Sequence, residues 1–146
     1  MRERKVTALY CDHCNKRGFQ RPSMARHERT CTANPQRECG MCQWMYENNE
    51  IDIHGKSVAE LYSAIGEGGD DGLARLREAS NDCPACMLSA IRMLNKANDE
   101  LWKQSDGKGF TATFHVDFDW KAERDRWNET STAIMNEQQQ DAGGYY

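Results

Sequence analysis

Cysteine is the residue type with the most potential for chemistry in this chain of 146 residues, which contains seven. Six cysteines form three Cys-x-x-Cys pairs, and the seventh, Cys31, follows His27 by four residues. A Cys-x-x-Cys turn brings two thiolates close enough to bind one metal ion, with sulfur–metal distances of about 2.3 Å. An odd number of cysteines, and an N-terminus without the apolar stretch of a secretory signal, argue against a purely disulfide-bonded framework. We therefore expect metal binding.

The candidate ligands divide into two sets of four. The first set is Cys11, Cys14, His27 and Cys31, and the second is Cys39, Cys42, Cys83 and Cys86. Four protein donors close a tetrahedral site and leave no position for a substrate, which is typical of structural zinc that contributes folding energy. The predicted cofactor is two zinc ions. Iron of the rubredoxin type is an alternative for the all-cysteine set.

The run Tyr10-Cys11-x2-Cys14-x12-His27-x3-Cys31 resembles a Cys2His2-type ββα zinc finger in its Cys-Cys-His-Cys variant. The resemblance implies a small apolar core. Phe19 stands one residue later than the aromatic of the family pattern, and Met24 stands where the family has leucine, so both positions stay apolar. The local pattern predicts a strand over residues 6–10 and a helix from about residue 22 to residue 31.

The resemblance also implies which residues of the finger would contact nucleic acid. Family fingers read bases from helix positions −1, 3 and 6, which correspond here to Gln20, Ser23 and Arg26. Glutamine suits adenine and arginine suits guanine. The cations that could contact phosphates are Lys16, Arg17, Arg21, Arg29 and Arg37. A single finger supplies little sequence-specific affinity, so protein contact and a purely structural role are alternatives.

Charge is distributed unevenly along the chain. Residues 1–37 carry nine Lys/Arg and three Asp/Glu, a net charge of +6, whereas residues 38–146 carry ten and twenty, a net charge of −10. A basic finger on an acidic body predicts two surfaces with different partners. We expect three parts: a basic zinc finger (1–37), an acidic zinc-stabilised α+β domain (38–136) and a flexible tail (137–146).

The second ligand set resembles the treble-clef zinc arrangement. Cys39-Gly40-Met41-Cys42 resembles a zinc knuckle, in which glycine permits a tight turn. Cys83-Pro84-Ala85-Cys86 opens a helix that continues through the apolar positions up to Leu101, with Asp82 expected as its N-cap. In the treble clef, a knuckle pair and a pair in a first helical turn share one metal ion.

The remaining pattern predicts helices and a short sheet. Ser57 begins a capping box for a helix reaching Ile65, and a Gly- and Asp-rich break over residues 66–72 precedes a short helix over 73–79. Apolar and polar residues alternate over 110–118, which predicts a strand paired with residues 51–53. Asp119 is expected to cap a last helix. The predicted fold class is α+β: a small ββα zinc finger followed by a treble-clef-like body with helices and a short antiparallel sheet.

The last helix carries Trp120, Trp127 and Ile134 at intervals of seven residues. This spacing places the three side chains on one face. We expect the face to pack on the body, with an oligomer or partner contact as the alternative.

Two enzymatic interpretations are weaker than a binding role. Cys-x-x-Cys pairs on both sides of Asp52 and His54 resemble the frame of HNH nucleases, but these two residues are not adjacent as the nuclease motif requires. The Cys83–Cys86 pair resembles a thioredoxin-type redox motif. That motif follows a strand, which residues 78–82 do not resemble, and a matching second pair favours metal. We therefore expect no catalytic activity.

The combined interpretation is a non-enzymatic, intracellular and cytoplasmic regulatory adaptor. Its finger would contact nucleic acid, and its acidic body or the Trp120–Trp127 helix would dock a protein. The alternatives are a purely protein-binding inhibitor or adaptor and, after it, an HNH-like nuclease. The short, zinc-rich chain is similar in style to small bacteriophage proteins. No apolar run approaches the roughly 20 residues of a membrane helix, so no membrane partner is expected.

Overall fold

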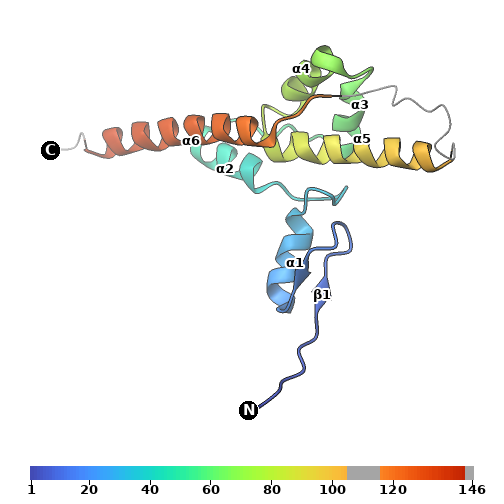
Figure 1. The fold of residues 1–146 in the computed structure, drawn as a ribbon. Helices are drawn as coiled ribbons and strands as arrows, with labels where there is room; N and C mark the ends of the chain where they lie inside the picture. The colour runs from blue at the N-terminus through green and yellow to red at the C-terminus, as the bar shows by residue number, and fades with distance from the viewer. Residues whose placement is uncertain (105–115, 144–146) are drawn as a thin grey trace.

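The computed structural model describes residues 1–104 and 116–143. These ranges are mostly helical with one two-stranded antiparallel sheet, which confirms the α+β class (Figure 1). The elements are β1 (Leu9–Tyr10), β2 (Arg17–Gly18), α1 (Arg21–Thr30), α2 (Gly40–Asn49), α3 (Val58–Ile65), α4 (Gly69–Ala79), α5 (Pro84–Gln104) and α6 (Trp120–Gly143). None of these helices is long and apolar enough to cross a membrane.

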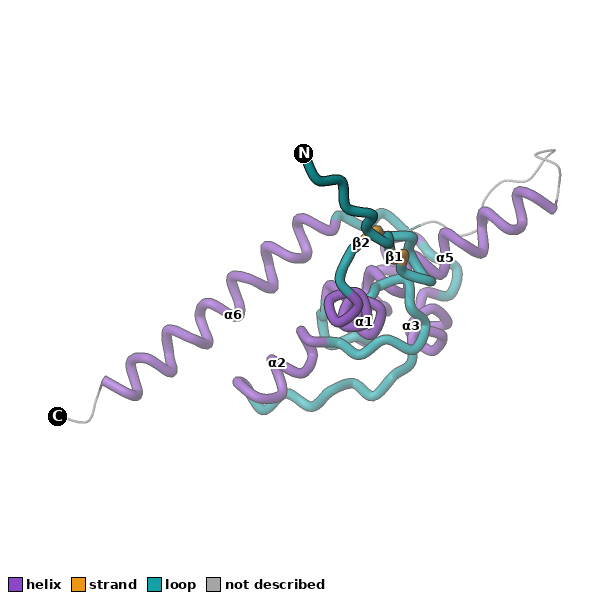
Figure 2. The backbone as a smooth tube through the Cα atoms, turned by 90° about the horizontal axis from the view of Figure 1, so that it is seen from below, coloured by secondary structure: helices purple, strands orange, loops and turns teal. Residues whose placement is uncertain are grey.

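The finger consists of β1, β2 and α1, and Figure 2 shows it seen end-on against the helices of the body. Leu9 pairs with Gly18 across the sheet, and α1 places Met24 in a small core with Cys11 and Cys31. The expectation for Phe19 is wrong, because its side chain is 57% exposed. Successive side chains of an extended segment point to opposite sides, so a shift of one residue from the family position turns the ring outward.

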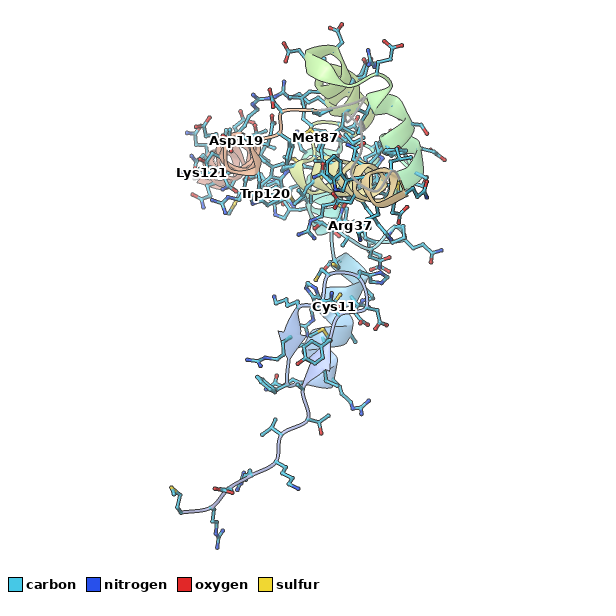
Figure 3. All side chains as sticks on the ribbon, turned by 45° about the vertical axis from the view of Figure 1, so that its right-hand side comes forward. Cys11, Arg37, Met87, Asp119, Trp120 and Lys121 are labelled. Atoms are coloured by element: carbon cyan, nitrogen blue, oxygen red, sulfur yellow. The ribbon has the colours of Figure 1, made fainter. Side chains whose placement is uncertain are left out.

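The body has its core where α3, α4 and α5 meet. Leu61 and Ile65 of α3, Leu76 of α4 and Met87 of α5 are almost completely buried there. Figure 3 labels Met87 among the helices of the body. The capping interaction predicted at the start of α3 is confirmed, since the Glu60 backbone N–H donates to Ser57 Oγ at 3.1 Å.

We expect Gly72→Ala to lower the free energy of unfolding by about 1–3 kcal/mol, the usual cost of overpacking. Gly72 lies where α4 crosses α3, and an added Cβ would come within 2.8 Å of the Ile65 carbonyl oxygen. Gly40→Ala at the start of α2 is the matched control, because a Cβ there meets no atom within 4 Å. Urea denaturation measures both variants. Equal midpoints for Gly72→Ala and the unchanged protein would contradict the close approach.

The loops of the body differ from the sequence prediction in two places. The helix expected from residue 73 begins at Gly69, so part of the Gly- and Asp-rich run is helical, with Asp70 and Asp71 in the first turn. Acidic residues are favourable there because they face the positive end of the helix dipole. Residues 51–53 form no strand. Of the strand expected over 110–118 as their partner, residues 110–115 lie outside the described residues. In the described ranges, the sheet therefore belongs to the finger.

Helix α6 lies across the body and extends beyond it (Figure 1). As predicted, Asp119 caps this helix, accepting a hydrogen bond from the Ala122 N–H at 3.2 Å. Trp127 meets Trp44 of α2 edge-on, with ring centroids 5.5 Å apart, so the tryptophan face packs on the body as expected. The helix continues through residue 143, into the segment for which a flexible tail was expected.

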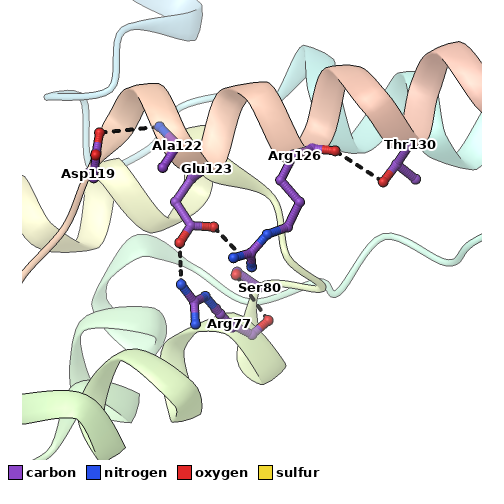
Figure 4. A network of polar contacts seen from close by, with 7 residues as sticks. All are labelled: Arg77, Ser80, Asp119, Ala122, Glu123, Arg126 and Thr130. Atoms are coloured by element: carbon purple, nitrogen blue, oxygen red, sulfur yellow. Dashed lines mark hydrogen bonds and ion pairs between the residues drawn. The ribbon is translucent and has the colours of Figure 1, made fainter.

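A buried carboxylate joins α6 to α4. Glu123 is 6% exposed and accepts from the Arg77 guanidinium, and Arg126 lies 3.5 Å from its other oxygen (Figure 4). A buried charge without a partner is costly, so this pairing fixes where α6 crosses the body.

Candidate metal centres

The first candidate centre lies inside the finger. Cys11 and Cys14 come from the turn after β1, His27 comes from α1, and Cys31 is the residue that follows the end of α1. The four ligand atoms all lie within 4.8 Å of one another, and Cys14 Sγ is 3.2 Å from His27 Nε2. The turn closes through Asn15, whose φ of 60° lies in the left-handed region that asparagine tolerates.

The thiols of this centre differ in pKa, and therefore in how readily they lose the proton that a metal ion must displace. Burial opposes the charged form of Cys14, but a hydrogen bond from the Lys16 backbone, with others from His27 and the neighbouring thiols, lowers its pKa to about 7. Burial raises the pKa of Cys31. A metal ion must displace the remaining protons, so binding at this centre becomes tighter as pH rises.

The second candidate centre lies where the N-termini of α2 and α5 meet. Cys39 Sγ is 3.4 Å from Cys83 Sγ, and Cys42 Sγ is 3.6 Å from Cys86 Sγ. These separations exceed a disulfide bond of about 2.05 Å and are close to the roughly 3.8 Å edge of a tetrahedron with sulfurs about 2.3 Å from the ion. Each of the two clusters could therefore hold a metal ion, and both donor sets are compatible with zinc.

The expected knuckle at Cys39–Cys42 is wrong. Cys39 is the N-cap of α2, and Cys42 lies in the first turn and donates its backbone N–H to Cys39 Sγ at 3.5 Å. The predicted role of Asp82 as N-cap is also wrong, because the Met87 N–H bonds to the carbonyl of Cys83 at 3.0 Å. Asp82 instead has φ of 59° in the turn before the helix. In both pairs, the first cysteine caps a helix.

This arrangement would stabilise the four thiolates of a metal-bound centre in the body. Each helix N-terminus carries a partial positive charge, and two of them face the same cluster. Hydrogen bonds from the Cys42 and Cys83 thiols lower the pKa of Cys39. Four thiolates outweigh one divalent ion by two negative charges, so further positive or donating groups are needed nearby.

Two residues that the sequence analysis did not assign to this centre contact Cys86. Arg37 Nη1 lies 3.7 Å from Cys86 Sγ, and the charge of Cys39 raises the pKa of Arg37 although burial alone would lower it. His54 is the second of these residues, and its Nε2 lies 3.4 Å from the same sulfur. The Lys56 N–H donates to His54 Nδ1, so the proton of a neutral ring sits on Nε2 and points to the thiolate. The spacing of residues in the sequence does not predict this contact between His54 and Cys86.

The seven residues expected to contact nucleic acid are all exposed. They are Lys16, Arg17, Gln20, Arg21, Ser23, Arg26 and Arg29. Gln20 is the N-cap of α1, and the Ser23 hydroxyl donates to its Oε1 at 3.3 Å. Arg17 lies over the Phe19 ring, 5.5 Å from the centroid. Within the described ranges, the ion pairs involve residues of α4 and α6 and leave these finger cations unpaired.

Comparison with known proteins finds no matching family model, no matching curated sequence and no matching solved structure. The two metal clusters and the surfaces around them therefore carry the functional interpretation.

Proposed function

We propose that this chain is a non-enzymatic zinc-binding adaptor, with one structural zinc ion in each cluster. The observation that carries the proposal is that all seven cysteines and one histidine form two closed four-donor sets. Closed sites of this kind stabilise a fold and leave no coordination position for a substrate. The ligands suit zinc because it accepts tetrahedral sulfur and imidazole donors without a geometric preference of its own.

The basic finger is the proposed nucleic-acid surface. Its cations are exposed and unpaired in the described ranges, which leaves them available to phosphates. Gln20, Ser23 and Arg26 lie at the end and along one side of α1, a spacing that suits contact with neighbouring bases.

The acidic body is the proposed protein-docking surface. Trp127 is already packed on Trp44, so the exposed acidic residues are better placed for a partner than the tryptophan face. The second candidate function is a purely protein-binding adaptor in which the finger also contacts protein. The exposed Tyr10 and Phe19 favour it, because aromatic side chains are enriched in protein interfaces.

An HNH-like nuclease finds less support. Such an enzyme needs a histidine free to act as a general base. Both ring nitrogens of His54 already have partners, the Cys86 sulfur and the Lys56 N–H.

Elemental analysis of the purified, reduced native protein tests the proposal directly. We expect two zinc ions per chain. A total of one metal ion or none would contradict the two-centre arrangement. One zinc and one iron per chain would support the rubredoxin-type alternative for the second centre. Removal of zinc with a chelator should lower the thermal midpoint strongly, because metal binding is coupled to folding.

A further inference from the structure

Arg37 lies at the junction of the finger and the body (Figure 3). Its Nε donates to the carbonyl oxygen of Thr30 at 3.3 Å, and its Nη1 lies 3.7 Å from Cys86 Sγ. Thr30 is the last residue of α1 in the finger, whereas Cys86 is a ligand in the first turn of α5. One guanidinium therefore joins the end of the finger helix to the second metal centre.

The segment that carries Arg37 is itself held on the finger. The Glu38 N–H donates to the Arg29 carbonyl at 2.8 Å, and the Asn34 side chain donates to the Glu28 carbonyl at 2.8 Å. These bonds satisfy carbonyl groups near the C-terminus of α1, where the helix provides no further backbone donor. A force that holds Arg37 in place consequently holds the finger as well.

The charge of the second centre provides that force. A divalent ion with four thiolates keeps a net negative charge, and the half-buried guanidinium of Arg37 beside it gains more from the attraction than a fully exposed one would. Without the ion, no metal bond holds Cys86 against the other three cysteines, so the sulfur that Arg37 contacts loses its fixed position. The coupling is reciprocal: if a bound metal ion stabilises the position of Arg37, then the Arg37 guanidinium stabilises the metal-bound thiolates by the same free energy.

We propose that Arg37 couples the two modules, so that a metal ion in the Cys39–Cys86 centre fixes the orientation of the finger on the body. The inference goes beyond zinc binding as such. Through this contact, the second centre, in the body, fixes the orientation of the finger that contains the first centre. The finger surface and the body surface are then held at one relative orientation.

Two measurements on Arg37→Met test the coupling. Methionine keeps much of the aliphatic volume but loses the charge and the donors. Competition with a chromogenic chelator should show about ten-fold weaker metal binding at the second centre, the lower end of the effect of losing an outer-sphere partner. The chelator can approach through a cleft of about 600 Å³ lined by Arg37, His54 and Cys86. Backbone 15N relaxation should show finger amides tumbling faster than body amides, whereas both share one correlation time in the unchanged protein.

Arg124→Met is the matched control, because Arg124 is an exposed arginine on α6, a helix that packs on α5 and α2, and should leave both readouts unchanged. The coupling requires that both readouts change together. A change in metal affinity alone, a change in finger tumbling alone, or no change in either would overturn it. If Arg37→Met does not fold, Arg37→Lys replaces it. Lysine keeps the charge but its single nitrogen cannot reach Thr30 and Cys86 together, so a smaller shift in both readouts is expected, and unchanged readouts would refute the proposal.

Discussion

Cys83→Ser is expected to remove the metal from the second centre and unfold the body. Cys83 is 4% exposed and lies at the N-cap of α5, where its sulfur faces Cys39 of α2. A structural zinc site contributes about 10–16 kcal/mol of binding free energy, which is as large as the whole stability of a typical domain, about 5–15 kcal/mol. Serine is a far weaker ligand than a thiolate, so losing one of four ligands should consume most of that stability.

Elemental analysis and thermal unfolding followed by circular dichroism measure this effect. We expect the zinc content to fall from two ions to one, with loss of the cooperative transition of the body. Cys11→Ser is the matched control, because it removes one ligand from the finger and should also release one zinc while leaving the body folded. A Cys83→Ser protein with an unchanged thermal midpoint would show that the second centre does not support the fold.

Simultaneous replacement of Arg17, Arg21 and Arg26 by glutamine is expected to abolish nucleic-acid binding at physiological salt. Each lost arginine contact should cost about 1–3 kcal/mol, and each lost phosphate contact should reduce the slope of log affinity against log salt by about one. The three side chains are exposed, so the zinc content and the thermal midpoint should stay as they are.

Fluorescence anisotropy with labelled duplex DNA and with labelled RNA of equal length measures the binding over a range of salt concentrations. The control variant replaces Lys103, Lys121 and Arg124 by glutamine, which removes the same charge from exposed positions on the body. Binding that survives the finger substitutions, or that does not weaken with salt, would contradict the proposed finger interface. Absence of binding to either probe would favour the purely protein-binding adaptor.

The two clusters of candidate metal ligands could be predicted because much of their pairing depends on local spacing. Within each Cys-x-x-Cys pair, the chain is too short for the two sulfurs to separate far, and Cys31 directly follows the helix that carries His27, four residues after it. The match between the two distant pairs, Cys39–Cys42 and Cys83–Cys86, followed because the finger had used every other cysteine. Helix starts at Ser57 and Asp119 were equally local, since a side chain caps a helix two or three residues away.

The sequence by itself therefore determined the Cys-x-x-Cys pairs, the finger helix and the caps at Ser57 and Asp119, all of which depend on residues that are neighbours in the chain. Only the tertiary structure decided what depends on distant packing. Helix α2 lacks a clear apolar periodicity and is supported by the Cys39 cap and by Trp127 from α6. Arg37 and His54 reach Cys86 across 49 and 32 residues. No local pattern encodes such contacts, because they arise only when the finger, the 50–57 loop and α5 are brought together around one buried centre.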